Sequence, residues 1–146
     1  MTVLRLLESV HGHLGVLAVA ALLHPAIFLR RGKPMSAGVR LSVVLSTVGA
    51  LLAFASGLVV YPAYREHVRA TLFARSTTAG LLFETKEHVA FFVLCIAVGA
   101  GTCAIVAPRD APDLRRSAAW AYAAAAGLCL LVVAMGSGIA SVAGFP

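Results

Sequence analysis

Four long apolar runs constrain this chain more than any other feature of its sequence. They cover about residues 10–29, 41–61, 88–107 and 117–142. Each is close to the roughly 20 residues that a helix needs to cross the hydrocarbon core of a bilayer. Charged residues or prolines separate them, as in the stretch from Arg30 to Pro34. Because the runs are continuously apolar rather than alternating, they exclude the strands of a membrane β-barrel.

The composition is typical of an integral membrane protein. Hydrophobic residues make up 60% of the 146 residues and charged residues 12%, whereas about 25% are charged in an ordinary soluble domain. We therefore predict an all-α protein, an integral membrane up-down four-helix bundle, as a single transmembrane domain over residues 1–146 with the lipid bilayer as its solvent. The first run continues to Leu29, so we expect a retained helix rather than a cleaved signal peptide.

The net charge of +6 lies in short connections between apolar runs, which is typical of membrane loops and not of a nucleic-acid-binding surface. The first and third connections hold seven basic residues: Arg30, Arg31, Lys33, Arg40, Arg109, Arg115 and Arg116. The N-terminal segment and the longer second connection hold five: Arg5, Arg65, Arg69, Arg75 and Lys86. The positive-inside rule then predicts a multi-pass protein of the cell inner membrane with both termini on the outer, periplasmic side.

Histidines are the main functional clue in so apolar a chain. There are five: His11, His13, His24, His67 and His88. In an up-down bundle the start of the first span, the end of the second and the start of the third lie at the same membrane face. We therefore expect four of the histidines, all but His24, to converge at the outer face.

This pattern favours a b-type haem. The first and third helices of an up-down bundle lie diagonally across the core, so His13 and His88 are expected at similar depth and facing each other. Neutral imidazoles are suitable axial ligands for haem iron. His67 or His11 is the substitute ligand if that pairing fails.

Haem propionates require cations, and the same face offers three. Arg65, Arg69 and Lys86 are the predicted partners, because arginine recognises carboxylates with paired donors. The alternative is that all three are ordinary anchors at the lipid headgroups.

His24 stands apart from the other histidines. It follows His13 by eleven residues, so it projects from nearly the same helix face, about 16 Å deeper. A second haem there would need another ligand, and we expect instead that His24 satisfies a backbone carbonyl freed by Pro25. One haem is thus the prediction and two the alternative.

In outline the chain resembles small bacterial four-helix membrane proteins of the cytochrome b kind. The resemblance covers the whole chain and rests on the four spans and on His13, His67 and His88 near one face. It implies haem b and electron transfer. On this interpretation the protein exchanges electrons at the outer face, with a quinone or a redox protein as its partner.

Two alternatives remain open. Three or four of the histidines, with Glu84 or Glu87, could bind copper or zinc, although neither HExxH nor a methionine-rich copper motif occurs. The chain could also be an accessory structural subunit of a larger membrane complex, or a homo-oligomer. Motifs of hydrolases and kinases are absent, so no catalytic residue is predicted.

Overall fold

The computed structural model describes residues 3–142 as five helices packed as a bundle. These are α1 (Val3–Leu29), α2 (Ala37–His67), α3 (Arg69–Arg75), α4 (Thr77–Val106) and α5 (Pro112–Val142). All but α3 are long and apolar enough to cross a membrane. The predicted all-α membrane bundle with four spans is therefore confirmed, and the chain is a multi-pass membrane protein.

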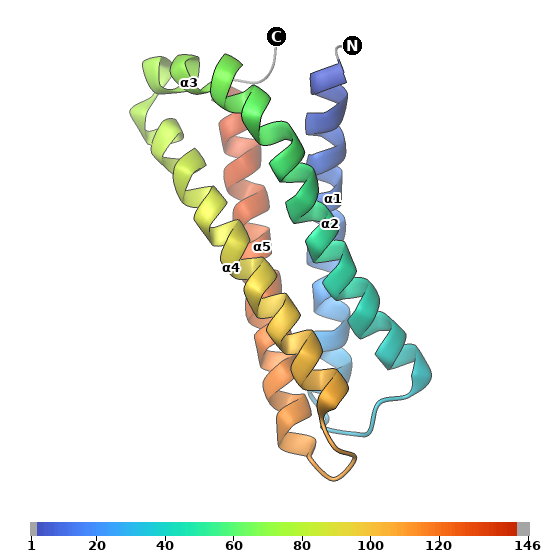
Figure 1. Cartoon of the computed structure of the whole chain (residues 1–146). Helices are drawn as coiled ribbons and strands as arrows, with labels where there is room; N and C mark the ends of the chain where they lie inside the picture. The colour runs from blue at the N-terminus through green and yellow to red at the C-terminus, as the bar shows by residue number, and fades with distance from the viewer. Residues whose placement is uncertain (1–2, 143–146) are drawn as a thin grey trace.

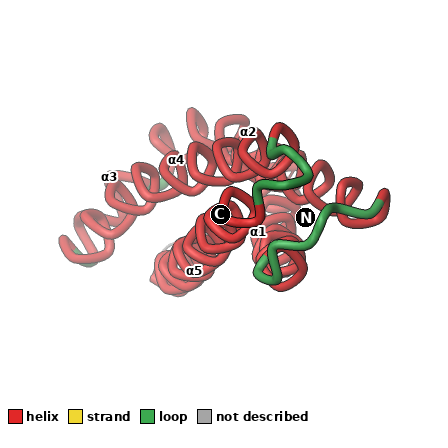
Figure 2. The backbone as a smooth tube through the Cα atoms, turned by 90° about the horizontal axis from the view of Figure 1, so that it is seen from below, coloured by secondary structure: helices red, strands yellow, loops and turns green. Residues whose placement is uncertain are grey.

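The four long helices run up and down and form two layers (Figure 1). Viewed along the bundle, α1 and α5 lie side by side in one layer, and α2 and α4 form the other (Figure 2). Helix α1 packs against α2 and α5, while α4 packs against α5 and α2. As expected from the sequence, α1 and α4 therefore lie diagonally across the core.

Each helix begins before or ends after the apolar run that predicted it, and the added turns mix polar and charged residues with apolar ones. Helix α4, for example, begins eleven residues before His88. The hydroxyl of Ser76 accepts a hydrogen bond of 3.2 Å from the backbone N–H of Ala79, which caps that helix start. Ser36 caps α2 in the same way through Val39. Such caps satisfy N–H groups that the first helical turn leaves without a partner.

Helix α3 has only seven residues and was not predicted. Leu72 is fully buried and holds it against the bundle. The phenyl ring of Phe73 lies against Gly80 of α4, where an added Cβ would meet ring atoms at 2.6 Å. Figure 1 shows α3 at the end of the bundle that also carries the start of α1 and the end of α5. We call this the α3 end.

The opposite end, which we call the Arg115 end, is closed by two loops. Arg115 is 2% exposed, and its guanidinium donates to the backbone carbonyls of Gly32 (2.9 Å), Pro108 (2.6 Å) and Arg109 (3.0 Å). One buried cation thereby joins both loops to α5. Its charge is balanced by oriented carbonyl dipoles, since no carboxylate contacts it among residues 3–142.

Candidate site at the α3 end

Three histidines of this end share one side-chain arrangement. In His13, His67 and His88 the ring Nδ1 donates to the backbone carbonyl four residues earlier, at 2.7, 3.0 and 2.8 Å. All three side chains are exposed. A carbonyl only accepts, so Nδ1 carries the proton and Nε2 keeps its lone pair. Histidines that bind metals are commonly fixed in this way by a bond from the other ring nitrogen.

His11 is different, because it points into the bundle. Its Nδ1 lies 2.9 Å from the hydroxyl of Ser56 on α2. The ring rests on Gly57, where an added Cβ would come within 2.9 Å of Cε1. His11 is thus packed between α1 and α2, and its Nδ1 is already engaged.

The expected pairing of His13 with His88 across the core is not assembled. The buried face of α1 carries Ala18, Leu22 and Ala26, and His11 shares that face. His13, two residues on, is turned about 200° around the helix and is exposed. It therefore projects away from the core that separates α1 from α4.

His24 does not bind the carbonyl that Pro25 frees. Its Nδ1 lies 2.5 Å from the Ser42 hydroxyl, and its ring lies 4.5 Å from that of Phe28. The freed carbonyl belongs to Ala21, four residues before the proline. The hydroxyl of Ser46 lies 2.6 Å from that oxygen. The prediction that His24 satisfies this carbonyl is therefore wrong, and a serine of α2 takes that role.

His88 lines an open hollow between α2 and α4. A groove of about 360 Å³ is lined by Tyr61, Glu87, His88, Phe91 and Phe92. It adjoins a cavity of about 180 Å³, which shares its first three residues and adds Arg65, Arg69, Phe83 and Glu84. We call the two hollows together the α2/α4 groove. Ligand sites typically have volumes of this order, with apolar walls and a few polar groups.

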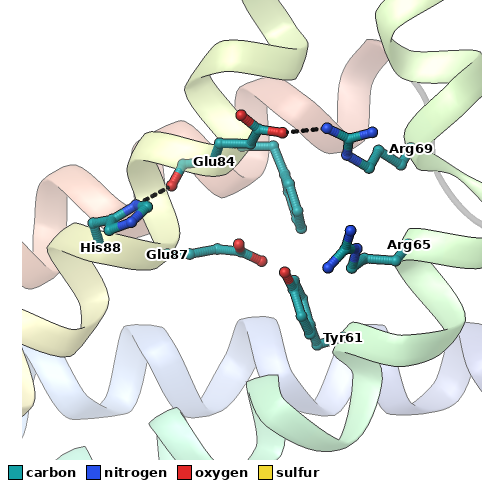
Figure 3. A pocket seen from close by; sticks show the side chains of 7 residues that line it. Tyr61, Arg65, Arg69, Glu84, Glu87 and His88 are labelled. Atoms are coloured by element: carbon teal, nitrogen blue, oxygen red, sulfur yellow. Dashed lines mark hydrogen bonds and ion pairs between the residues drawn. The ribbon is translucent and has the colours of Figure 1, made fainter.

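Both charged and aromatic side chains line this groove (Figure 3). The hydroxyl of Tyr61 and the guanidinium of Arg65 both face the carboxylate of Glu87. The Arg65 guanidinium carbon lies 5.8 Å from the centre of the Tyr61 ring. Tyr61 in turn stacks on Phe83, with ring centres 6.4 Å apart. The groove is therefore lined by aromatic rings together with charges of both signs.

The three predicted propionate partners have different places. Arg69 is paired with Glu84 at 2.6 Å and lies over the Phe73 ring, so it ties α3 to α4. Arg65 also lines the groove, but it forms no ion pair with a carboxylate of residues 3–142. Lys86 lines neither hollow. Its stem passes near Gly136 of α5, so it points into the bundle, and its role as a propionate partner stays a prediction.

Sequence reasoning missed the aromatic wall. Phe91 and Phe92 follow His88 by three and four residues, and Glu84 precedes it by four. Side chains at these spacings share one helix face. This spacing was the available signal, but in a membrane helix it does not tell a groove from lipid contact.

No three His, Cys, Asp or Glu side chains within residues 3–142 come close enough together to hold a metal ion. A zinc or copper site of the usual three or four side chains is therefore not assembled in that part of the chain.

Comparison with protein families, with curated protein sequences and with solved structures finds no match for this chain. The resemblance to small membrane cytochromes thus remains one of outline, and functional inference rests on the groove itself.

Proposed function

We propose that this protein is a membrane electron-transfer protein that holds haem b in the α2/α4 groove, with His88 as an axial ligand. One observation carries the proposal. The His88 Nδ1 is fixed 2.8 Å from the Glu84 carbonyl oxygen at the edge of an aromatic groove. This bond sets the tautomer whose Nε2 can bind iron and restrains the ring.

The rest of the groove suits a flat, largely apolar cofactor with two carboxylates. Tyr61, Phe91 and Phe92 supply aromatic walls. Arg65 stands at the polar edge and is the predicted propionate partner, because a guanidinium binds carboxylates through paired donors. Glu87 faces Arg65 in the structure, so a propionate would compete with that carboxylate for the same cation.

Haem, when bound, supplies reversible one-electron chemistry, and the axial ligand helps set its potential. The residues of this chain bind and orient it. Phe92 is 60% exposed and Phe91 54%, so the open side of the groove is apolar and suits lipid contact. A quinone dissolved in the bilayer, or a second redox protein, is the proposed exchange partner.

This proposal retains His88 as an axial ligand, but it places the haem in the α2/α4 groove instead of between His13 and His88. His13 becomes the less favoured ligand, because it projects from the exposed side of α1. His67 remains the substitute because it is exposed and its Nδ1 is held by a carbonyl, whereas His11 is packed between α1 and α2. The charge of the connections supports an inner-membrane location with the α3 end on the periplasmic side.

The test is the visible spectrum of protein purified in detergent from haem-supplemented cells, recorded as dithionite-reduced minus oxidised, with iron, copper and zinc measured on the same sample. We expect a reduced b-type α band and iron. His88→Ala should lose the band, and His13→Ala, the matched exposed histidine, should keep it. A protein without haem, or a His88→Ala variant with an unchanged band, would refute the proposal.

A further inference from the structure

The two ends of the bundle differ in charge. The Arg115 end carries seven basic residues and two acidic ones, Asp110 and Asp113, whereas the α3 end carries five basic and four acidic residues. The Arg115 end therefore has an excess of five positive charges, against one at the α3 end. Its one ion pair within residues 3–142 joins Arg116 to Asp113. Most of its exposed cations are thus not neutralised within this chain.

Three of these cations are brought together by Arg115. Its guanidinium donates to the backbone carbonyls of Gly32 and Arg109, so the two loops meet at one side chain. Arg31 and Lys33 flank Gly32 in the sequence. The side chains of Arg31, Lys33 and Arg109 are all exposed. Because the donors of Arg115 are already engaged by carbonyls, it positions the other three cations.

The loop that carries two of these cations is restrained. Gly32 has a φ of +66°, and an added Cβ there would lie 2.9 Å from the Cβ of Pro112. The α1–α2 loop therefore packs closely against the start of α5. A site whose backbone is held in place before binding loses less affinity to ordering.

Large apolar side chains adjoin the same cations. Phe28 lies three residues before Arg31 and is 52% exposed, and Val106 lies three residues before Arg109 and is 68% exposed. Both belong to helices that are long and apolar enough to cross a membrane. A soluble anion would contact only the cations. A phospholipid matches both parts of the surface, since it carries acyl chains as well as a phosphate.

We infer that this surface binds an anionic phospholipid. Arg31, Lys33 and Arg109 bind the headgroup phosphate, and Phe28 and Val106 contact the acyl chains. Arginine and lysine are both common phosphate partners, and basic side chains next to a membrane span attract anionic lipids. The inference is independent of what the α2/α4 groove binds.

Trp120 provides a native reporter for this lipid. It is the only tryptophan of the chain, it is 77% exposed, and it follows Arg116 by four residues on the same face of α5. Bromine on nearby acyl chains quenches its fluorescence. The protein is reconstituted in vesicles of equal amounts of phosphatidylcholine and phosphatidylglycerol, with bromine on the chains of either one lipid or the other.

We expect the quenching to show about a fivefold preference for phosphatidylglycerol, the scale of one cation beside an anionic headgroup. In the triple variant Arg31→Gln, Lys33→Gln, Arg109→Gln the preference should disappear, with circular dichroism to confirm that the variant folds. Equal quenching by the two lipids in the wild-type protein, or an unchanged preference in the folded triple variant, would overturn the inference.

A charge-matched pair of single variants separates a defined site from net charge. Arg109→Gln should lower the preference, whereas Arg75→Gln, which removes an exposed cation of the α3 end, should leave it unchanged. An equal loss in both variants would show an effect of net charge alone and would overturn the assignment of Arg109.

Inorganic phosphate distinguishes the lipid from a free anion. Added at the same ionic strength as a chloride control, it should leave the preference for phosphatidylglycerol unchanged, because it cannot contact Phe28 and Val106 as acyl chains do. A loss of preference in phosphate but not in chloride would show that the cations bind phosphate without acyl chains, and it would overturn the assignment to lipid.

Discussion

The hydroxyl of Ser46 lies 2.6 Å from the backbone carbonyl oxygen of Ala21, the carbonyl that Pro25 leaves without its usual helical donor. The same hydroxyl lies 2.7 Å from the Ser42 carbonyl within α2. Ser46 is 2% exposed. The single hydroxyl proton of Ser46 is shared between these two carbonyls, so one buried serine partly compensates for a proline in the neighbouring helix and ties α1 to α2.

This relationship predicts a double-mutant cycle. Ser46→Ala should destabilise the protein by about 1 kcal/mol, the scale of interhelical hydrogen bonds in membranes, because the Ala21 carbonyl loses its donor. In a Pro25→Ala background the new backbone N–H can bond that carbonyl, so Ser46→Ala should then cost much less. Unfolding in mixed detergent micelles measures both. Equal costs in the two backgrounds would show that Ser46 does not serve the proline site.

Arg115 and its neighbour Arg116 should respond very differently to substitution. The buried Arg115 donates to three carbonyls, and lysine cannot reproduce that planar set of donors. Arg115→Lys should lower the free energy of unfolding by about 2 to 4 kcal/mol. Arg116→Lys is the control, since Arg116 is exposed and its one ion pair within residues 3–142 is with Asp113, and exposed pairs contribute less than about 1 kcal/mol. Similar thermal stability of the two variants would contradict this account of the Arg115 end.

Gly32 should tolerate no side chain. Its φ of +66° lies in the left-handed region, which costs other residues about 1 to 2 kcal/mol. An added Cβ would also come within 2.9 Å of the Pro112 Cβ. Gly32→Ala should therefore lower the melting temperature, whereas Gly38→Ala in the first turn of α2 should not, because its nearest neighbour is at 3.9 Å. Equal melting temperatures would argue against this loop conformation.

Gly57→Ala should displace His11. The new methyl would come within 2.9 Å of the imidazole, so the ring should leave Ser56. Because both glycines lie inside α2 and gain alike in helix propensity, this displacement should leave Gly57→Ala about 1 to 3 kcal/mol less stable than Gly49→Ala. Gly49→Ala, where an added Cβ meets nothing within 4 Å, should instead stabilise α2 by up to about 1 kcal/mol. Thermal unfolding compares the two, and imidazole NMR shifts follow His11. An unchanged His11 signal in Gly57→Ala would contradict the contact.

The sequence predicted the four spans because hydropathy marks the residues that lie in the hydrocarbon core. Hydropathy did not predict where the helices begin and end. Turns that contain polar residues, such as the start of α4, continue the helix outside the hydrocarbon core. The seven residues of α3 were also missed. They are too few to show a periodicity, and their position depends on tertiary burial of Leu72.

The histidine pairing failed for a different reason. Helix α1 is apolar on nearly all sides, so its pattern does not say which face is buried. Packing is decided by small residues such as Ala18 and Ala26, and they turn His11 inward and His13 outward. His88 was found by its place at the start of a span, but the groove beside it depends on how side chains of α2 and α4 pack near α3, which hydropathy does not specify.

The most direct measurement of the central claim is imidazole rescue of a His88→Gly variant, followed by the reduced-minus-oxidised visible spectrum. If the His88 nitrogen binds haem iron, the variant should lose the b-type band, and free imidazole added during haem reconstitution should restore it. His67→Gly, the exposed histidine with the same Nδ1 bond, should keep its band without imidazole. A His88→Gly variant that retains the wild-type band without imidazole would contradict the account.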